Sequence, residues 1–365
     1  MPQHRFASIH VVGTNGKSSV TRMIAALLEA HGLSVGACIS PHAERWAERV
    51  LIHGEEIGPV EFGAAVERVS QAAEVVNRTL DDGEAVTQFE AATAAAFVAF
   101  AAARIQVGVI EAGLGGRLDA TNTIPSRVSV LTSVGLDHTE WLGESEAEIA
   151  AEKLAVVRDN STLVLGRVSP AIASLAERIA AEHGARLLRA ADDLSADFYL
   201  RAPGPFQRRN FALALAAASA FLGELDHGLV AEVAATLTVP GRLEQIAEHP
   251  PTLIDAAHNA DGAAALAEAL PALAAGPVIA CLAILLDKDA AAIVRALAPA
   301  LEHVVCSELP ADLLAAHGRP GAASHSAAAL AALCADAGLV AEVRPNLSEA
   351  LRRARELAAA TSGGT

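Results

Sequence analysis

The feature that most constrains the fold is a regular alternation of short apolar, β-branched runs with longer helix-like segments. The runs predict strands at 7–12, 33–40, 106–111, 127–133 and 161–165, and a hairpin at 50–57. The intervening segments predict helices at 17–31, 58–79, 87–103, 145–158 and 206–236. Parallel strands need long crossover connections, so this alternation indicates an α/β protein with a mainly parallel sheet.

A proline–glycine pair at Pro240 and Gly241 interrupts this pattern and predicts a hinge. A second βα series follows, with strands at 253–256, 278–282, 304–307 and 340–343 and helices at 260–274, 288–300, 326–337 and 347–359. At about 150 residues per domain, 365 residues suggest two domains. We therefore predict a first α/β domain at 1–240 and a smaller one at 241–365.

Composition excludes several classes of protein. The formal net charge of −16, without a basic stripe, argues against a general nucleic-acid binder. No apolar run reaches the roughly 18 residues that span a bilayer. The four cysteines form no CxxC pair, and the first residues lack the apolar core of a signal peptide. These observations predict a cytoplasmic enzyme or binding protein.

Lysine is rare in this chain. Of the 27 basic residues only three are lysines, namely Lys17, Lys153 and Lys288. A chain that uses arginine almost everywhere keeps lysine where the chemistry of an amine differs from that of a guanidinium. The three positions are therefore candidate functional sites, although a solvated lysine on an acidic helix remains an alternative for Lys153.

The segment Gly13–Ser19 joins a predicted strand to a predicted helix and reads GTNGKSS. Glycines, a lysine, a hydroxyl and a helix N-terminus are what a phosphate-binding loop with magnesium requires. The strict pattern would place a glycine where Val11 stands, so the loop is a variant. The pattern favours nucleotide binding over a glycine-rich turn, and leaves open whether Ser18 or Ser19 contacts magnesium.

Polar residues also follow other predicted strands. Glu111 ends one strand, and Asp137 and His138 follow another, so we expect them at the same sheet edge. The sequence pattern alone leaves the roles of these residues open, because Glu111 could be a surface carboxylate and His138 a structural histidine. In the second domain, Asp255 and His258 follow a strand and are expected to face the first domain.

Ten segments occur in the order of a known family: GTNGK, CISPH, TQFE, EAGLGGRLDATN, SVGLDHTEWLG, AEK, QRRN, PGR, DAAHN and DKD. The chain thereby resembles the Mur ligase superfamily, in its folylpolyglutamate synthase/dihydrofolate synthase branch. The resemblance implies a P-loop-type Mur ligase central domain followed by a Rossmann-like amino-acid-binding domain. It implies an ATP-dependent ligase that adds L-glutamate to a folate or dihydropteroate through an acyl phosphate. It also implies ATP, two magnesium sites, small-molecule partners, no nucleic-acid or membrane partner, and a monomer or small homo-oligomer.

The resemblance assigns roles position by position. The implied ATP-binding residues are Thr14, Asn15, Gly16, Lys17, Ser18, Ser19, Asn210, Arg242 and Asp255. The implied metal ligands are Ser40, Glu111, His138 and Lys153, with Lys153 carrying a carbamate derived from CO2. The implied catalytic residues are Lys17, Lys153 and His258, and the implied acceptor-binding residues are Thr87, Gln88, Phe89, Glu90, Leu118, Asp119 and Ala120.

Three departures from the family pattern concern the acceptor and the metal. Only twelve residues precede Gly13, where the family usually has a few tens, GKSS replaces GKGS, and DAAHNAD replaces DGAHNP. Two alternatives therefore stay open: the same chemistry on a non-folate carboxylate, and an ATP-binding protein without ligase activity. The sequence assigns no mechanism to Lys288.

Overall fold

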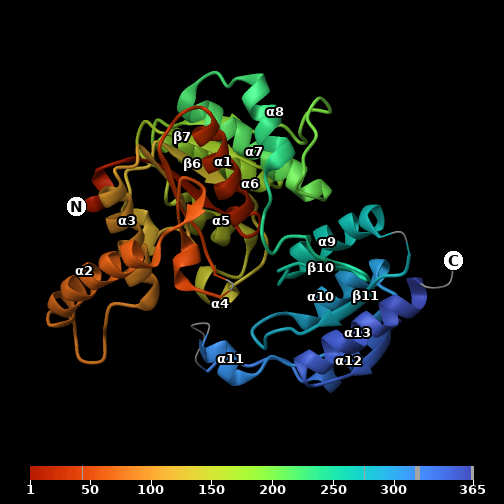
Figure 1. Ribbon diagram of the computed structural model, residues 1–365. Coiled ribbons are helices and arrows are strands. Elements are labelled where there is room, and N and C mark those ends of the chain that lie inside the picture. Colours follow the sequence, from red (N-terminus) through yellow and green to blue (C-terminus); the bar gives the residue numbers. More distant parts are fainter. Residues whose placement is uncertain (43, 275, 317–320, 363–365) are drawn as a thin grey trace. The chain divides into compact units, whose positions relative to one another are not determined.

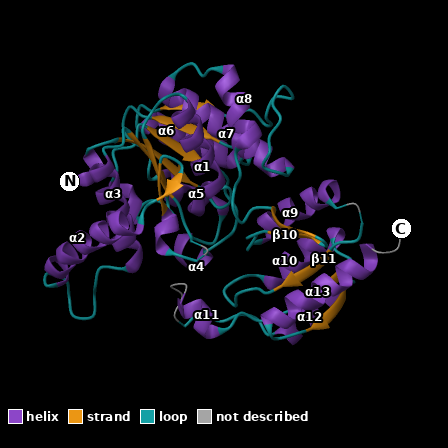
Figure 2. Cartoon of the chain, in the orientation of Figure 1, coloured by secondary structure: helices purple, strands orange, loops and turns teal. Residues whose placement is uncertain are grey.

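The computed structural model describes residues 1–42, 44–274, 276–316 and 321–362. The chain forms two compact units (Figures 1 and 2). Unit 1 comprises Met1–Arg201 and Arg208–Leu237, and unit 2 comprises Ala202–Gln207 and Thr238–Thr365. Segment 202–207 lies between elements of unit 1 in the sequence, so the sequence pattern gave no sign that it packs with unit 2. Among the described residues, no helix combines the length and the apolar character needed to cross a membrane.

Unit 1 is built on an eight-stranded sheet of order β4-β3-β2-β5-β1-β6-β7-β8. The strands are β1 (Ala7–Val12), β2 (Val35–Cys38), β3 (Val50–Ile52), β4 (Glu55–Glu56), β5 (Val107–Glu111), β6 (Val128–Leu131), β7 (Thr162–Leu165) and β8 (Arg186–Arg189). In the sheet order, all neighbours from β2 to β8 pair in parallel, whereas β3 pairs antiparallel with both β2 and β4. The predicted parallel sheet and the predicted hairpin are thus both confirmed.

Helices cover this sheet. They are η1 (Pro2–His4), α1 (Lys17–Ala30), η2 (Trp46–Arg49), α2 (Pro59–Asn77), α3 (Gln88–Ala103), η3 (Ala120–Thr123), α4 (Thr139–Leu142), α5 (Glu146–Leu154), α6 (Pro170–Glu182), α7 (Pro205–Leu222) and α8 (His227–Thr236). Capping boxes at Thr87 and Ser145 start α3 and α5. One apolar cluster packs α3 against β2, β3 and β5, and another packs α5 and α6 against β6 and β7.

Unit 2 contains a parallel sheet of order β11-β12-β13 and a separate antiparallel pair. The strands are β9 (Glu244–Glu248), β10 (Pro251–Ile254), β11 (Ile279–Leu282), β12 (His303–Cys306) and β13 (Val340–Val343). The helices are α9 (Ala260–Leu273), α10 (Ala290–Leu297), η4 (Ala298–Ala300), α11 (Ala311–Ala316), α12 (Ala327–Asp336) and α13 (Leu347–Ser362). Two fold predictions are corrected here, one in each unit.

The predicted single helix at 206–236 is wrong, because α7 ends before Gly223, which adopts a φ of +94°, and Asp226 caps α8. The strand predicted at 253–256 does not begin the parallel series. It is β10, which pairs antiparallel with β9. Elements α6, β8, β9 and α11 had no counterpart in the sequence prediction.

Candidate active site

Four adjacent parallel strands deliver the candidate residues of unit 1 to one edge of the sheet. In the order β2-β5-β1-β6, their carboxyl ends lead into Ser40, Glu111, the phosphate loop and segment 132–138. Ligands of open α/β sheets bind at this edge, outside the carboxyl ends of the strands. The topology therefore brings together four of the predicted segments, which lie far apart in the sequence.

The phosphate loop requires its glycines. Gly16 has a φ of +84° and caps α1, a backbone conformation that side chains with a Cβ rarely adopt. A Cβ at Gly16 would also lie 2.7 Å from Oδ1 of Asn210, and one at Gly13 would overlap the hydroxyl of Thr132. Asn210 on α7 thus lies against the phosphate loop, where the sequence comparison expected an ATP contact.

Segment 132–135 holds the phosphate loop from the neighbouring strand. The backbone N–H of Asn15 donates to the hydroxyl of Ser133 at 2.9 Å, and Thr132 Oγ1 donates to the carbonyl of Asn15 at 2.6 Å. The Thr14 hydroxyl accepts from the N–H of Gly135 at 3.1 Å. These residues, which the sequence interpretation passed over in favour of His138, fix the shape of the loop. Their position directly after a strand of the same edge was the available signal.

Ser18, Glu111 and Ser40 form a cluster of oxygen atoms beside this loop. The hydroxyl of Ser18 lies 2.9 Å from Oε1 of Glu111 and 3.2 Å from the carbonyl oxygen of Ser40, and the N–H of Ser40 donates to Oε2 of Glu111 at 2.9 Å. Glu111 is buried, with 3 % of its surface exposed. Ser19, the residue after Ser18, is also buried on α1. Of the two serines, Ser18 makes the contact to Glu111. Hard oxygen donors of this kind suit a magnesium-like cation.

Two lysines converge on one carbonyl. Nζ of Lys17 and Nζ of Lys153 donate to the carbonyl oxygen of Gly13 at 3.0 Å and 3.1 Å. Lys153 comes from α5 and is 4 % exposed. Burial, and then the positive charge of Lys17, lower the pKa of Lys153 to about 7. A substantial fraction of Lys153 is therefore a neutral amine near neutral pH.

His138 lies at the same edge, at the N-terminus of α4, with a φ of +52°. Its Nε2 is 3.8 Å from Oδ1 of Asp137, and about a third of its side chain is exposed. The left-handed backbone turns the chain sharply between β6 and α4. His138 thus combines an unusual backbone conformation with an accessible ring, which is compatible with the metal-binding role that the resemblance implied.

Known proteins match this chain over both units. The Mur ligase middle domain matches residues 11–199, and the Mur ligase glutamate ligase domain matches residues 241–363. A dihydrofolate synthase/folylpolyglutamate synthase of Mycobacterium tuberculosis is 35% identical, over 91% of this chain and 74% of the relative. The chain belongs to the folylpolyglutamate synthase/dihydrofolate synthase family of Mur ligases.

Solved structures agree with this membership. The M. tuberculosis folylpolyglutamate synthase complexed with ADP superimposes with a TM-score of 0.89 at 33% identity, covering 98% of this chain and 84% of that one. A bifunctional folylpolyglutamate synthase/dihydrofolate synthase with Mn, AMPPNP and L-glutamate bound gives a TM-score of 0.80 at 31% identity, covering 96% and 83%. The α/β fold predicted from the sequence is thus that of the Mur ligases.

The predicted acceptor residues of this Mur ligase fall into two groups. Thr87 and Glu90 bond each other in the capping box of α3, and the carboxylate of Asp119 accepts from the N–H groups of Leu114 and Thr121. These side chains therefore order their own segments. The other four are Gln88, Phe89, Leu118 and Ala120.

Within that second group, Phe89 and Leu118 are the large apolar side chains. The ring of Phe89 lies against Gly113, leaving no space there for a Cβ. Leu118 is 92 % exposed, an unusual position for a large apolar side chain. Gln88 is exposed at the start of α3, and Ala120 is half-buried at the start of η3.

In unit 2, Arg242, Asp255 and His258 lie near one another around the end of β10. Asp255 accepts from the N–H groups of Leu243 at 2.9 Å and Ala257 at 2.8 Å. Burial raises the pKa of Asp255, while those hydrogen bonds and the charge of Arg242 act in the opposite direction. His258 contacts the carbonyl of Ala256 through Nδ1 at 3.0 Å. The predicted residues of this unit are thus brought together.

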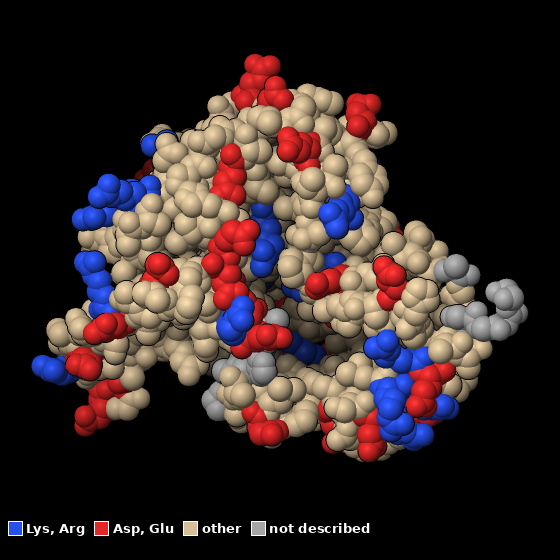
Figure 3. All heavy atoms as spheres, viewed as in Figure 1, with Lys and Arg blue, Asp and Glu red and all other residues tan. Residues whose placement is uncertain are grey.

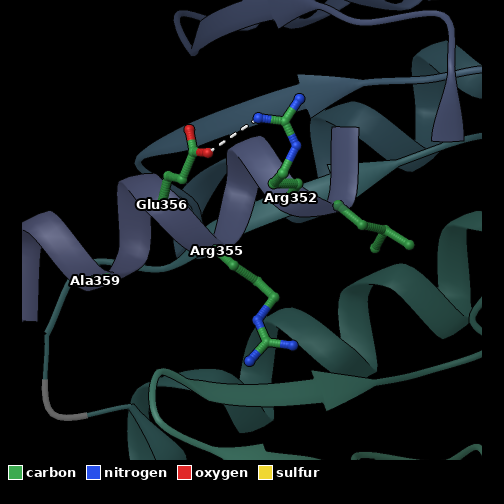
Figure 4. Close-up of a pocket in the computed structure, with 5 residues that line it drawn as sticks. Arg352, Arg355, Glu356 and Ala359 are labelled. Atoms are coloured by element: carbon green, nitrogen blue, oxygen red, sulfur yellow. Dashed lines mark hydrogen bonds and ion pairs between the residues drawn. The ribbon is translucent and has the colours of Figure 1, made fainter. Parts of the chain in front are cut away.

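Charged side chains of both signs are interspersed on the face drawn in Figure 3, with a dense mixed group in the region of α12 and α13. A shallow pocket on α13 is lined by Leu351, Arg352, Arg355, Glu356 and Ala359 (Figure 4). Arg352 pairs there with Glu356 at 3.3 Å. None of the predicted site residues lines this pocket.

Proposed function

We propose that this protein joins L-glutamate to the carboxylate of a folate or a dihydropteroate in an ATP-dependent reaction. Its family consists of ATP-dependent ligases, and its relatives include enzymes named for both products. The observation in the site that supports the proposal best is the convergence of Lys17 and Lys153 on Gly13, beside the Ser18–Glu111–Ser40 cluster.

The residues present fit a nucleotide and a divalent cation. The N–H groups at the N-terminus of α1 and the ammonium of Lys17 would hold the phosphates, as in other glycine-rich phosphate loops. The oxygens of Ser18, Ser40 and Glu111, with His138, would hold the metal. A bound divalent cation supplies positive charge against the phosphoryl oxygens during transfer. Asn210, which lies against the phosphate loop, would contact the nucleotide from unit 1. For Arg242 and Asp255 of unit 2, the ATP-binding role stays a prediction.

The reaction runs in two steps. An oxygen of the acceptor carboxylate attacks the γ-phosphorus of ATP, and ADP leaves. The amine of glutamate then attacks the acyl carbon, phosphate leaves, and the nitrogen loses a proton. Negative charge accumulates in both transition states, so the fixed charge of Lys17 and the positioning of the reactants supply the catalysis. His258 would hold the amino acid, and the segments at Phe89 and Leu118 would contact the acceptor.

We propose further that Lys153 carries a carbamate. The neutral amine of Lys153 attacks CO2, a C–N bond forms and one proton is released. The lowered pKa of Lys153 leaves this amine available near neutral pH, and the ammonium of Lys17 nearby offsets the charge of the carbamate. The product is an anionic oxygen donor for a metal. The planar guanidinium of arginine lacks a free amine of this kind, which is consistent with the rarity of lysine in the chain.

Phosphate release tests the ligase. Purified protein is given ATP and Mg²⁺ with dihydropteroate or a folate, crossed with L-glutamate and with other amino acids. We expect ADP and phosphate only when both an acceptor and an amino acid are present, and a product heavier by one glutamyl residue. ATP turnover without acceptor, or none with any carboxylate, would contradict ligation. Turnover confined to non-folate carboxylates would keep the chemistry and replace the acceptor.

A further inference from the structure

A buried histidine on the central strand has no part in the proposed chemistry. His10 lies on β1, three residues before the phosphate loop begins, and its side chain is fully buried. Its Nε2 lies 2.7 Å from Oγ1 of Thr121 in η3, a residue that is also fully buried. A polar side chain in such surroundings is costly unless it is hydrogen-bonded, so its partners indicate its role.

The direction of these hydrogen bonds follows from the chemistry of the groups. The hydroxyl of Thr121 lies 2.5 Å from Oδ1 of Asp119, and a carboxylate can only accept. The single hydroxyl hydrogen of Thr121 therefore points to Asp119, and its oxygen accepts from the Nε2–H of His10. Nδ1 of His10 carries no hydrogen in this arrangement, and it has no hydrogen-bond partner among the residues that the structure describes.

His10 is consequently a fixed donor and not a proton carrier. Burial, with a further contribution from the charge of Arg158, lowers the pKa of His10 to about 3. A second proton on Nδ1 would find no acceptor there. The ring stays neutral at any pH at which the protein functions, and one N–H directed at Thr121 is what it contributes.

The chain His10–Thr121–Asp119 closes the glycine loop, which we define as residues 112–119. The carboxylate of Asp119 accepts from Leu114, near the start of the loop, and from Thr121, just beyond its end. The loop packs at Gly113 against Phe89 and at Gly116 against the backbone of Glu152 and Lys153. Its outer residue, Leu118, is exposed.

We propose that His10 is a positioning residue, which acts through Thr121 and Asp119 to hold the glycine loop in place for the acceptor. This rests on the proposed function, since the contact between the loop and Phe89 lies on the predicted acceptor side. Removing the donor should loosen the loop and weaken acceptor binding. The phosphate loop is held separately by segment 132–135, so nucleotide affinity should change little.

Two readouts test the proposal, and one of them needs no activity. In limited trypsin digestion of the full protein, the rate of cleavage after Arg117 reports on the loop, with cleavage after the exposed Arg78 as internal reference. Steady-state kinetics give the KM for the acceptor, and calorimetry gives the Kd for ADP with Mg²⁺. If no folate-like acceptor is turned over by the unsubstituted protein, the proposed function fails, and the digestion still decides on the loop.

The variants are chosen in matched pairs. His10→Leu and Thr121→Val remove the hydrogen bond, whereas His10→Gln and Thr121→Ser retain a donor and a hydroxyl. Ser8→Ala is the control, because Ser8 is buried on the same face of β1 and its hydroxyl has no hydrogen-bond partner among the residues that the structure describes. If His10→Leu fails to fold, Thr121→Val is used for the test, because it replaces only the hydroxyl by a methyl group.

We expect the two disrupting variants to be cleaved after Arg117 about tenfold faster and to raise the acceptor KM about tenfold, the factor that corresponds to about 1.4 kcal/mol. The retaining variants and Ser8→Ala should stay within about twofold of the unsubstituted protein, and the Kd for ADP should also stay within about twofold. Cleavage of Thr121→Val at the unchanged rate would overturn the proposal. So would a His10→Gln variant that behaves like His10→Leu, or a loss confined to ADP binding.

Discussion

Each unit buries one lysine near the edge of its parallel sheet, and the two lysines differ in their charged neighbours. Lys153 in unit 1 donates to Gly13 beside Lys17. Burial and then the charge of Lys17 lower the pKa of Lys153, while Asp137 and Asp119 act in the opposite direction. Lys288 in unit 2 has a side chain that is 7 % exposed, and its Nζ lies 3.8 Å from Oδ2 of Asp287. Burial alone therefore does not distinguish them.

The difference teaches which property makes a lysine reactive. An ammonium that faces a carboxylate stays protonated and holds the chain in place, whereas burial beside another cation favours the neutral amine. A neutral amine is the form that reacts with CO2. We therefore expect the proposed carbamate at Lys153 and not at Lys288.

The largest expected effect comes from replacing Lys153 by arginine, and the same replacement at Lys288 is its control. Lys153→Arg should lower kcat about 10³-fold, because the guanidinium keeps a positive charge where the account requires an anionic metal donor. Lys288→Arg keeps the charge beside Asp287 and should lower kcat less than about tenfold. Phosphate release under saturating substrates measures both. Equal losses in the two variants would remove the distinction between the lysines.

The two serines of the phosphate loop test whether the oxygen atoms of Ser18, Glu111 and Ser40 bind the metal. Ser18→Ala removes the hydroxyl next to Glu111 and should weaken the binding of Mg²⁺ with ADP about tenfold. Ser19→Ala alters a buried hydroxyl of α1 and should change that affinity less than about twofold. Titration calorimetry with and without Mg²⁺ separates metal from nucleotide binding. A larger loss in Ser19→Ala would place the metal ligand at the other serine.

A further prediction concerns the pH dependence of stability. The pKa of Lys153 is about 7 in the fold and about 10.5 in the unfolded chain. Between these values the unfolded chain binds one proton more, so the free energy of unfolding rises with pH, by at most about 1.4 kcal/mol per unit. Below pH 7 both states are protonated and this slope vanishes.

Urea unfolding in CO2-free buffer measures this term as the difference between the unsubstituted protein and Lys153→Met. Lys288→Met serves as the matched control, since the account expects it to retain the slope between pH 7 and 10.5. A Lys153→Met variant that keeps the slope would show that another group titrates there.

The sequence predicted the central fold because its strands are strong local signals. Ala7–Val12 and Val340–Val343 were expected at the bounds that the structure has. Elements with weak local patterns were not predicted. β8 is a four-residue edge strand with an arginine at each end, and β9 has no buried residue and no alternation of apolar and polar side chains. The break between α7 and α8 was visible only as Gly223 followed by Asp226, a stop and a start that the apolar pattern obscured.

The candidate site was predicted at the level of segments and less well at the level of atoms. Order along the chain and the strand ends sufficed to group Glu111 with the phosphate loop. The preference for Ser18 over Ser19 and the closing role of Asp119 depend on side-chain directions, which no spacing rule supplies. The same holds for His10, whose partner Thr121 lies more than a hundred residues away.

The most direct test of the account is chemical trapping of the carbamate. The protein is equilibrated with ¹³C-labelled bicarbonate, ADP and Mg²⁺, treated with an alkylating agent that esterifies carbamates, digested and analysed by mass spectrometry. We expect one labelled lysine, Lys153, with Lys17 and Lys288 unlabelled and with the label lost in Lys153→Arg. No label at Lys153, or equal labelling of Lys288, would contradict it.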